Sequence, residues 1–148
     1  MVDRSVLESR LGKLEELLAK LRSLAELDRA AFLADDISKT LAERWLQLAL
    51  ECATDLGHHV IASEGWPSPS SYRETFRILA ERGVLSAPLA SQMERWAGLR
   101  NVLVHLYLEI DHRIVFEALT HELDHLEAFA AAIARAASSD EDRRGTDE

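Results

Sequence analysis

Cysteine, proline and glycine are scarce in this chain of 148 residues, which has one, three and six of them. The single cysteine, Cys52, excludes an internal disulfide, and so few breakers disfavour a protein built of turns and loops. No apolar run approaches the roughly 20 residues that cross a bilayer. The N-terminal stretch MVDRSVLESRLGK lacks the apolar core of a signal peptide. We therefore expect a single cytoplasmic domain, rich in helices and not held in a membrane.

Apolar residues with helical spacing cover the first half of the chain. Five leucines step by 4, 3, 4 and 3, which predicts an amphipathic helix over about 3–26: Leu7, Leu11, Leu14, Leu18 and Leu21. Apolar residues from Ile37 to Leu56 keep this rhythm and add a second apolar side. This pattern predicts a kinked helix over about 29–62, with Asp28 as its N-cap, in the middle of a bundle.

The second half begins with a loop over 63–71, which contains one glycine and two prolines. A helix restarts at Tyr72 and is expected to stop at Gly83. Ser86 can cap a fourth helix, and Asp111 can cap a last long one that reaches about residue 137.

These segments predict an all-α, up-and-down bundle of about five helices over residues 1–137. No segment shows the alternation of a β-strand, and there is no glycine-rich phosphate loop. Residues 138–148 read SSDEDRRGTDE and contain no apolar side chain. We expect them to form an acidic, disordered tail.

One short segment, RNVLVHLY, places polar groups in an apolar frame. Arg100 carries a permanent planar fork that suits a phosphate, and His105 titrates near neutrality. Asn101 shares a helical face with His105 and could fix its tautomer, while Tyr107 adds a hydroxyl. Arg100 and His105 lie about 140° apart on an ideal helix. They converge only if the segment bends, if Arg100 lies in a turn near Gly98, or if a second subunit contributes.

Without further information, the ordinary interpretation of this segment is a surface arginine and a half-buried histidine with satisfied hydrogen bonds. The pattern Arg100-NVLV-His105-Leu106-Tyr107 and its flank, however, resemble the HEPN superfamily and specifically its HepT-like toxins. The resemblance covers about residues 1–135. It implies a homodimer whose two motifs share one cleft, which also answers the angular separation of Arg100 and His105.

The resemblance further implies a ribonuclease of a type VII-like HepT/MntA toxin–antitoxin system, without metal or cofactor. His105 would be the general acid or base, and Arg100 would stabilise the phosphate. The requirement for a ribose 2′-OH would make RNA the substrate. A minimal nucleotidyltransferase antitoxin, MntA-like, would attach AMP to Tyr107 and block the cleft. The alternative is a non-catalytic HEPN dimer that binds a nucleotide or the transferase, although such a module has little need for both Arg100 and His105.

A second motif, His121-Glu122-Leu123-Asp124-His125, matches the pattern of zinc-dependent proteases. His121 and His125 could face one zinc, with Glu122 as the base. No third ligand stands out downstream, and no strand is predicted for a substrate to pair with. We therefore expect a solvated helix face at this position and no metal site.

The formal charge of the chain is -9, which argues against a uniformly basic surface for nucleic acid. The segment 73–100 is the exception, because five arginines outweigh three glutamates there. Doubled across a dimer axis, it could form a basic cleft around Arg100. The candidates for RNA contacts beside that cleft are Arg73, Arg77, Arg82 and Arg95.

Overall fold

The computed structural model describes residues 4–104 and 109–145, and over these ranges the chain is helical with no strand. The all-α prediction is therefore confirmed. The helices are α1 (Arg4–Ala25), α2 (Arg29–Ala34), α3 (Asp36–Ser63), α4 (Tyr72–Glu81), α5 (Ala87–Val104), α6 (His112–His121) and α7 (Leu123–Gly145). None of the helices in these ranges combines the length and apolarity that a membrane span requires.

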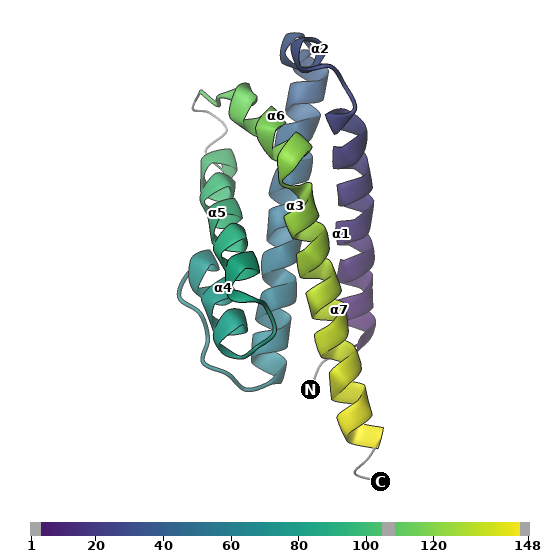
Figure 1. Cartoon of the computed structure of the whole chain (residues 1–148), viewed down its shortest axis with the longest axis vertical. Helices are drawn as coiled ribbons and strands as arrows, with labels where there is room; N and C mark the ends of the chain where they lie inside the picture. The colour runs from purple at the N-terminus through teal and green to yellow at the C-terminus, as the bar shows by residue number, and fades with distance from the viewer. Residues whose placement is uncertain (1–3, 105–108, 146–148) are drawn as a thin grey trace.

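Helix α3 is the centre of the bundle, as its two apolar sides predict. It contacts α1 and α7 on one side and α4 and α5 on the other, while α2 and α6 pack near its N-terminal end (Figure 1). The short α4 and the loop before it reverse the chain, so that α5 runs back alongside α3. Three segments that are far apart in sequence thereby meet on one side of the molecule: residues 51–58, 72–75 and 98–100.

The leucines of α1 form one wall of the core, since Leu7, Leu14, Leu18 and Leu21 are buried as their spacing predicts. Aromatic pairs join the other helices across the core. Phe76 of α4 meets Phe129 of α7 edge to face, with ring centres 5.8 Å apart. Burying these side chains is the main source of stability, because each removes a large apolar surface from water.

The helix count differs from the prediction, because both long helices are divided. Asp35 adopts an extended conformation and accepts a hydrogen bond from the Ile37 amide, so it ends α2 and caps α3. Glu122 leaves helical geometry between α6 and α7. Neither position carries a proline or glycine, so the sequence gives no local signal of the break. Asp111 caps α6 as expected, by accepting from the Arg113 amide.

The disorder expected from residue 138 is wrong for the described part of the tail, because α7 continues to Gly145. No proline interrupts this stretch, and the hydroxyls of Ser138 and Ser139 bond back to carbonyls four residues earlier. A polar sequence can extend a helix that packing has already nucleated, since propagation is much easier than nucleation. A domain boundary at residue 137 stays a prediction, but no helix ends there.

Candidate functional site

Arg100 is held where three helices meet. It lies in the last part of α5, its guanidinium carbon 4.2 Å from the centre of the Tyr72 ring on α4. Its Nη2 atom lies 3.7 Å from Oε1 of Glu51 on α3. The side chain is only 19% exposed, and its buried Nε makes no hydrogen bond within the described part of the chain. A guanidinium held in this way keeps its charge and retains an N–H group that no neighbour uses.

The position of Tyr72 follows from the start of α4. Tyr72 is the first residue of this helix, and the preceding Ser71 caps it by accepting a hydrogen bond from the Glu74 amide at 3.1 Å. The Tyr72 ring is also nearly parallel to the His58 imidazole, at an angle of 9° and with 6.5 Å between centres. The cap and the ring contact together fix the surface on which the Arg100 guanidinium rests.

A buried contact between α3 and α4 supports this arrangement. Nε2 of His58 lies 2.9 Å from the hydroxyl of Thr75, which is fully buried. Gly57, just before His58, makes the close approach possible. A Cβ atom at Gly57 would come within 2.8 Å of the Thr75 methyl group. A glycine is therefore required where the two helices cross.

Glu51 gives the site a negative component. Gln47, one turn earlier on α3, donates a long hydrogen bond of 3.4 Å to the Glu51 carboxylate. At 3.7 Å and with Glu51 39% exposed, the attraction to Arg100 is partly screened by water. An incoming phosphate can compete with such a contact, because it offers the planar fork of Arg100 more charge and better geometry.

The other residues of the predicted motif lie at or beyond the end of the described part of α5. His105 and Tyr107 lie outside the described residues, and His105 directly follows Val104, the last residue of α5. Asn101 lies within α5, but its side chain is outside the described part. Gly98 does not interrupt α5, which is continuous through it. Arg100 is therefore on a helix and not in a turn, so of the three ways for it to meet His105 this one is excluded.

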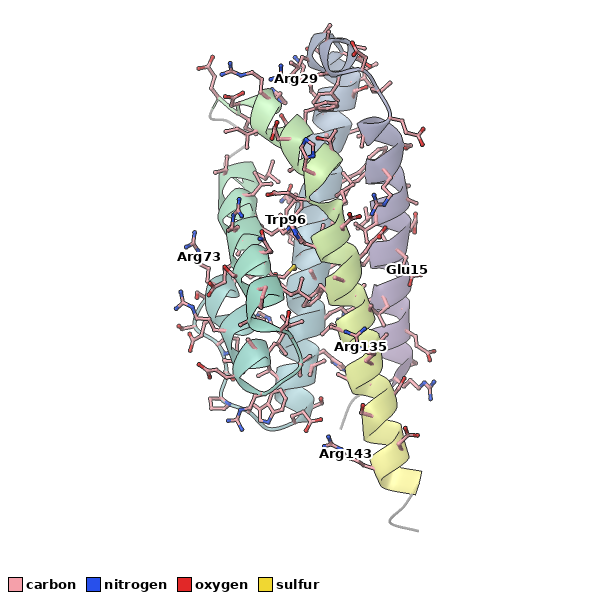
Figure 2. All side chains as sticks on the ribbon, viewed as in Figure 1. Glu15, Arg29, Arg73, Trp96, Arg135 and Arg143 are labelled. Atoms are coloured by element: carbon pink, nitrogen blue, oxygen red, sulfur yellow. The ribbon has the colours of Figure 1, made fainter. Side chains whose placement is uncertain are left out.

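The four arginines proposed for RNA contacts have different surroundings. Arg73 is exposed, and its guanidinium passes beside Gly98, where an added Cβ would lie 3.0 Å from it. Figure 2 shows its side chain projecting outward from the α4–α5 side of the bundle. The other three are engaged elsewhere: Arg77 pairs with Glu94, Arg95 lies 3.5 Å from Glu122, and Arg82 lies over Trp66. Arg73 is the one of the four placed near Arg100.

The zinc-protease pattern does not form one helical site. Glu122 is the non-helical residue between α6 and α7, so His121 and His125 belong to different helices. Within the described residues no group of three or more histidine, cysteine or acidic side chains could hold a metal ion. The His121–His125 segment is therefore the junction between α6 and α7.

Sequence reasoning missed Glu51, His58 and Tyr72 as parts of the site. A usable signal was present for two of them. Glu51 and His58 are seven residues apart, so they share a face of α3 with Gln47 and Thr54, and this polar stripe stands out on a helix with two apolar sides. No local pattern indicates that Tyr72 would meet Arg100, because only the reversal of the chain through α4 brings them together.

Known proteins resemble this chain over most of its length. It is 31% identical over 124 residues to the tRNA nuclease HepT of Aphanizomenon flos-aquae, a match that covers 82% of this chain and 83% of that protein. It is 32% identical over 88 residues to the mRNA nuclease HepT of Shewanella oneidensis. That match covers 60% of this chain and 66% of the nuclease, just under two thirds of its length.

Solved structures share the fold. YutE of Bacillus subtilis, described as a cytosolic protein of unknown function, matches with a TM-score of 0.84 and 25% identity. The match covers 94% of this chain and 93% of YutE. The tri-AMPylated HEPN toxin of Shewanella oneidensis, in complex with its MNT antitoxin, has a TM-score of 0.82 at 24% identity, over 91% of this chain and 99% of that one.

The family model for ribonuclease HepT-like proteins matches residues 14–133. This range contains the three helices that hold Arg100 and the whole of the RNVLVHLY segment. The chain therefore belongs to the HepT-like ribonuclease family.

Proposed function

We propose that this chain is the ribonuclease toxin of a type VII-like toxin–antitoxin pair and that it cuts RNA in the cytoplasm without a metal ion. The observation that carries the proposal is the setting of Arg100. Its guanidinium is half-buried on Tyr72 and keeps a buried N–H without a partner among the described residues. A cation held in place before substrate arrives stabilises developing negative charge without having to reorganise.

In the proposed reaction, His105 acts as the base and removes the proton of a ribose 2′-OH. The 2′-oxygen attacks the adjacent phosphorus, a cyclic 2′,3′-phosphate forms, and the bond to the 5′-oxygen breaks. The leaving 5′-oxygen takes a proton from an acid, the role of His105 in its protonated form. Arg100 donates to the phosphate oxygens as charge builds on them, and Asn101 orients His105. DNA, which has no 2′-OH, is not a substrate.

The partner of the toxin is a minimal nucleotidyltransferase that modifies Tyr107. The solved relatives support this part, since one is a tri-AMPylated toxin bound to its MNT antitoxin. The Tyr107 hydroxyl oxygen attacks the α-phosphorus of ATP, and pyrophosphate leaves. The resulting AMP group lies seven residues from Arg100 along the chain and occupies the phosphate site with its own negative charge.

The active form is a homodimer in which two copies of the motif face one cleft. Two exposed apolar residues flank the segment that carries His105 and Tyr107: Val102 near the end of α5, at 51% exposure, and Ile114 near the start of α6, at 58%. Exposed apolar side chains beside a catalytic motif are suited to burial in a contact between subunits. Arg73 flanks the same cleft and contacts the RNA backbone.

The test is cleavage of a fluorescent single-stranded RNA by the purified protein in excess EDTA. We expect the wild type to cut RNA and leave the DNA of the same sequence intact. His105→Ala and Arg100→Lys should each lower the rate by at least about a hundredfold. Arg95→Lys, on the same helix but paired with Glu122, is the matched control and should keep its activity. Loss of cleavage in EDTA, or full activity of a folded His105→Ala protein, would overturn the proposal.

The contact between Arg100 and Glu51 is the one observation that favours the non-catalytic alternative, because it can also be explained as a purely structural ion pair. The same assay separates the two functions. A wild-type dimer that binds the nucleotidyltransferase but cuts no RNA would be the binding module. Modification by the antitoxin is tested by measuring the intact mass of the protein after co-expression with the nucleotidyltransferase. The wild type should gain the mass of AMP, and Tyr107→Phe should not.

A further inference from the structure

A cavity lies at the C-terminal end of α3, the end away from α2 and α6. It has a volume of about 390 Å³ and lies where the C-terminal end of α3 meets the loop after α4 and the last turns of α7. Its charged and aromatic lining residues are Glu64, Trp66, Arg82, Arg135 and Arg143. Glu64 is 13 residues beyond Glu51 on a helical rise of about 1.5 Å per residue, so this cavity is about 20 Å from the Arg100 site along α3.

The cavity is positively charged in an acidic chain. Three arginines line it against one glutamate, whereas the whole chain carries -9. Arg135 and Arg143 lie two turns apart on α7 (Figure 2). Ser139, about one turn from each, also lines the cavity. Arg135 forms no ion pair with any residue that the structure describes. This combination is suited to an anionic ligand with several oxygen acceptors.

An aromatic wall faces these cations. The Trp66 ring is half-buried, and the Arg82 guanidinium carbon lies 5.3 Å from its centre. Val60 and Val84 continue the wall with apolar surface. A planar ring with an attached phosphate could place its ring against Trp66 and its phosphate toward α7.

Two glycine turns give this wall its shape. Gly65, with φ of 71°, directly precedes Trp66, and Gly83, with φ of 79°, directly follows Arg82. Both conformations favour glycine over residues with a side chain. The Trp66 amide then bonds back to the Ile61 carbonyl at 3.1 Å, which holds the loop against α3. The volume also falls within the range of about 300–1,000 Å³ that is usual for small-molecule sites.

From these features we infer that the cavity is a binding site for a nucleoside phosphate, with the base against Trp66 and the phosphate between Arg82, Arg135 and Arg143. The ligand is a free nucleotide or one nucleotide of an RNA strand, since both offer the same chemistry. The inference concerns binding only. It does not depend on RNA cleavage at Arg100, and its test measures no cleavage.

The test titrates the full-length protein with AMP and measures heat and tryptophan fluorescence. We expect AMP to bind and quench the fluorescence, and Trp66→Phe to remove most of the quench. Arg135→Glu should weaken AMP binding by at least about tenfold, because it replaces an attraction with a repulsion. Arg29→Glu, an exposed arginine on α2 at the other end of the bundle, is the matched control and should change the affinity less than about twofold.

A second arm uses a 2′-O-methyl oligonucleotide, which a 2′-OH mechanism cannot cut. If Arg135→Glu weakens AMP and the oligonucleotide alike, a free nucleotide is sufficient for the site; if it weakens only the oligonucleotide, the ligand is part of a strand. Both results support the inference. Three results would overturn it: equal affinity for AMP and inorganic phosphate, AMP and oligonucleotide affinities that Arg135→Glu leaves unchanged, and AMP affinity that is lost in Tyr72→Leu and not in Arg135→Glu.

Discussion

The guanidinium of Arg100 lies 4.2 Å from the centre of the Tyr72 ring, although the two residues belong to different helices and are 28 positions apart. The same ring is nearly parallel to the His58 imidazole. The orientation of the arginine on α5 therefore depends on the start of α4 and, through His58, on α3. Five predictions test this arrangement and the fold that produces it.

Removing the Tyr72 ring should impair the proposed reaction without unfolding the protein. A cation over an aromatic ring is stabilised by about 0.5–2 kcal/mol, which is about two- to thirtyfold in rate. We expect Tyr72→Leu to lower kcat for RNA by this factor and Tyr72→Phe to retain activity. Trp45→Leu removes a cation–aromatic contact elsewhere, with Lys20 of α1, and should leave kcat unchanged. Equal activity of the leucine and phenylalanine variants at position 72 would show that the ring does not position Arg100.

Neutralising Glu51 should separate binding from chemistry. In Glu51→Gln the carboxylate no longer competes with the phosphate for Arg100, so we expect KM to fall. The guanidinium also loses one constraint on its orientation, so kcat should fall as well. The measurement is a full titration with RNA substrate, and Glu15→Gln, an acidic residue on the exposed face of α1, is the control. A rise in KM would contradict the competition.

The crossing of α3 and α4 should not tolerate a methyl group at Gly57. A Cβ there would lie 2.8 Å from the Thr75 methyl group, and overpacking of this kind costs about 1–3 kcal/mol. We expect Gly57→Ala to lower the free energy of unfolding in urea by that amount. Gly12 is a matched control on α1, with no atom near its added Cβ, and Gly12→Ala should raise stability by about 0.5–1 kcal/mol. Equal effects at the two glycines would contradict the close packing.

A charge at the apolar rim of the motif should break the proposed dimer. Val102→Glu or Ile114→Glu would place a carboxylate in the subunit contact, where its desolvation is unfavourable. We expect light scattering to give either variant the mass of a monomer, and we expect neither variant to cut RNA. Ile37→Glu, at an isoleucine that is 71% exposed at the start of α3, is the control and should remain dimeric. A wild-type monomer would refute the dimer directly.

The junction between α2 and α3 should weaken in acid. Hydrogen bonds from the Ser38 hydroxyl and the Ile37 amide lower the pKa of Asp35 below its ordinary 3.8. The cap therefore contributes fully above that pH and is lost as the pH falls through the lower, folded-state value. Asp35→Asn still offers an acceptor but does not titrate, so the stability gap between the two proteins should shrink from about pH 6 to about pH 3. Thermal unfolding of both proteins at each pH measures this difference in stability. A difference that stays constant with pH would contradict the role of the Asp35 carboxylate as the cap of α3.

The sequence indicated Arg100 because chemistry and spacing in RNVLVHLY are local properties. The same reasoning overestimated the length of two helices, since no proline or glycine marks Asp35 or Glu122, where the helices divide. It also treated the polar tail as disordered, although α7 extends to Gly145. Periodicity reports which residues face the core. It does not report the direction in which a helix must turn to reach that core.

By itself, the sequence determined that this is an all-helical protein with a buried leucine face on α1. It also determined that position 100 carries an arginine, a residue suited to binding phosphate. These features depend on the spacing of neighbouring residues. Only the tertiary structure decided that Arg100 rests on Tyr72 beside Glu51, and that Arg82 and Arg135 line a cavity with Trp66. Each of these groupings joins segments far apart in the chain, and their proximity follows from how the helices pack around α3.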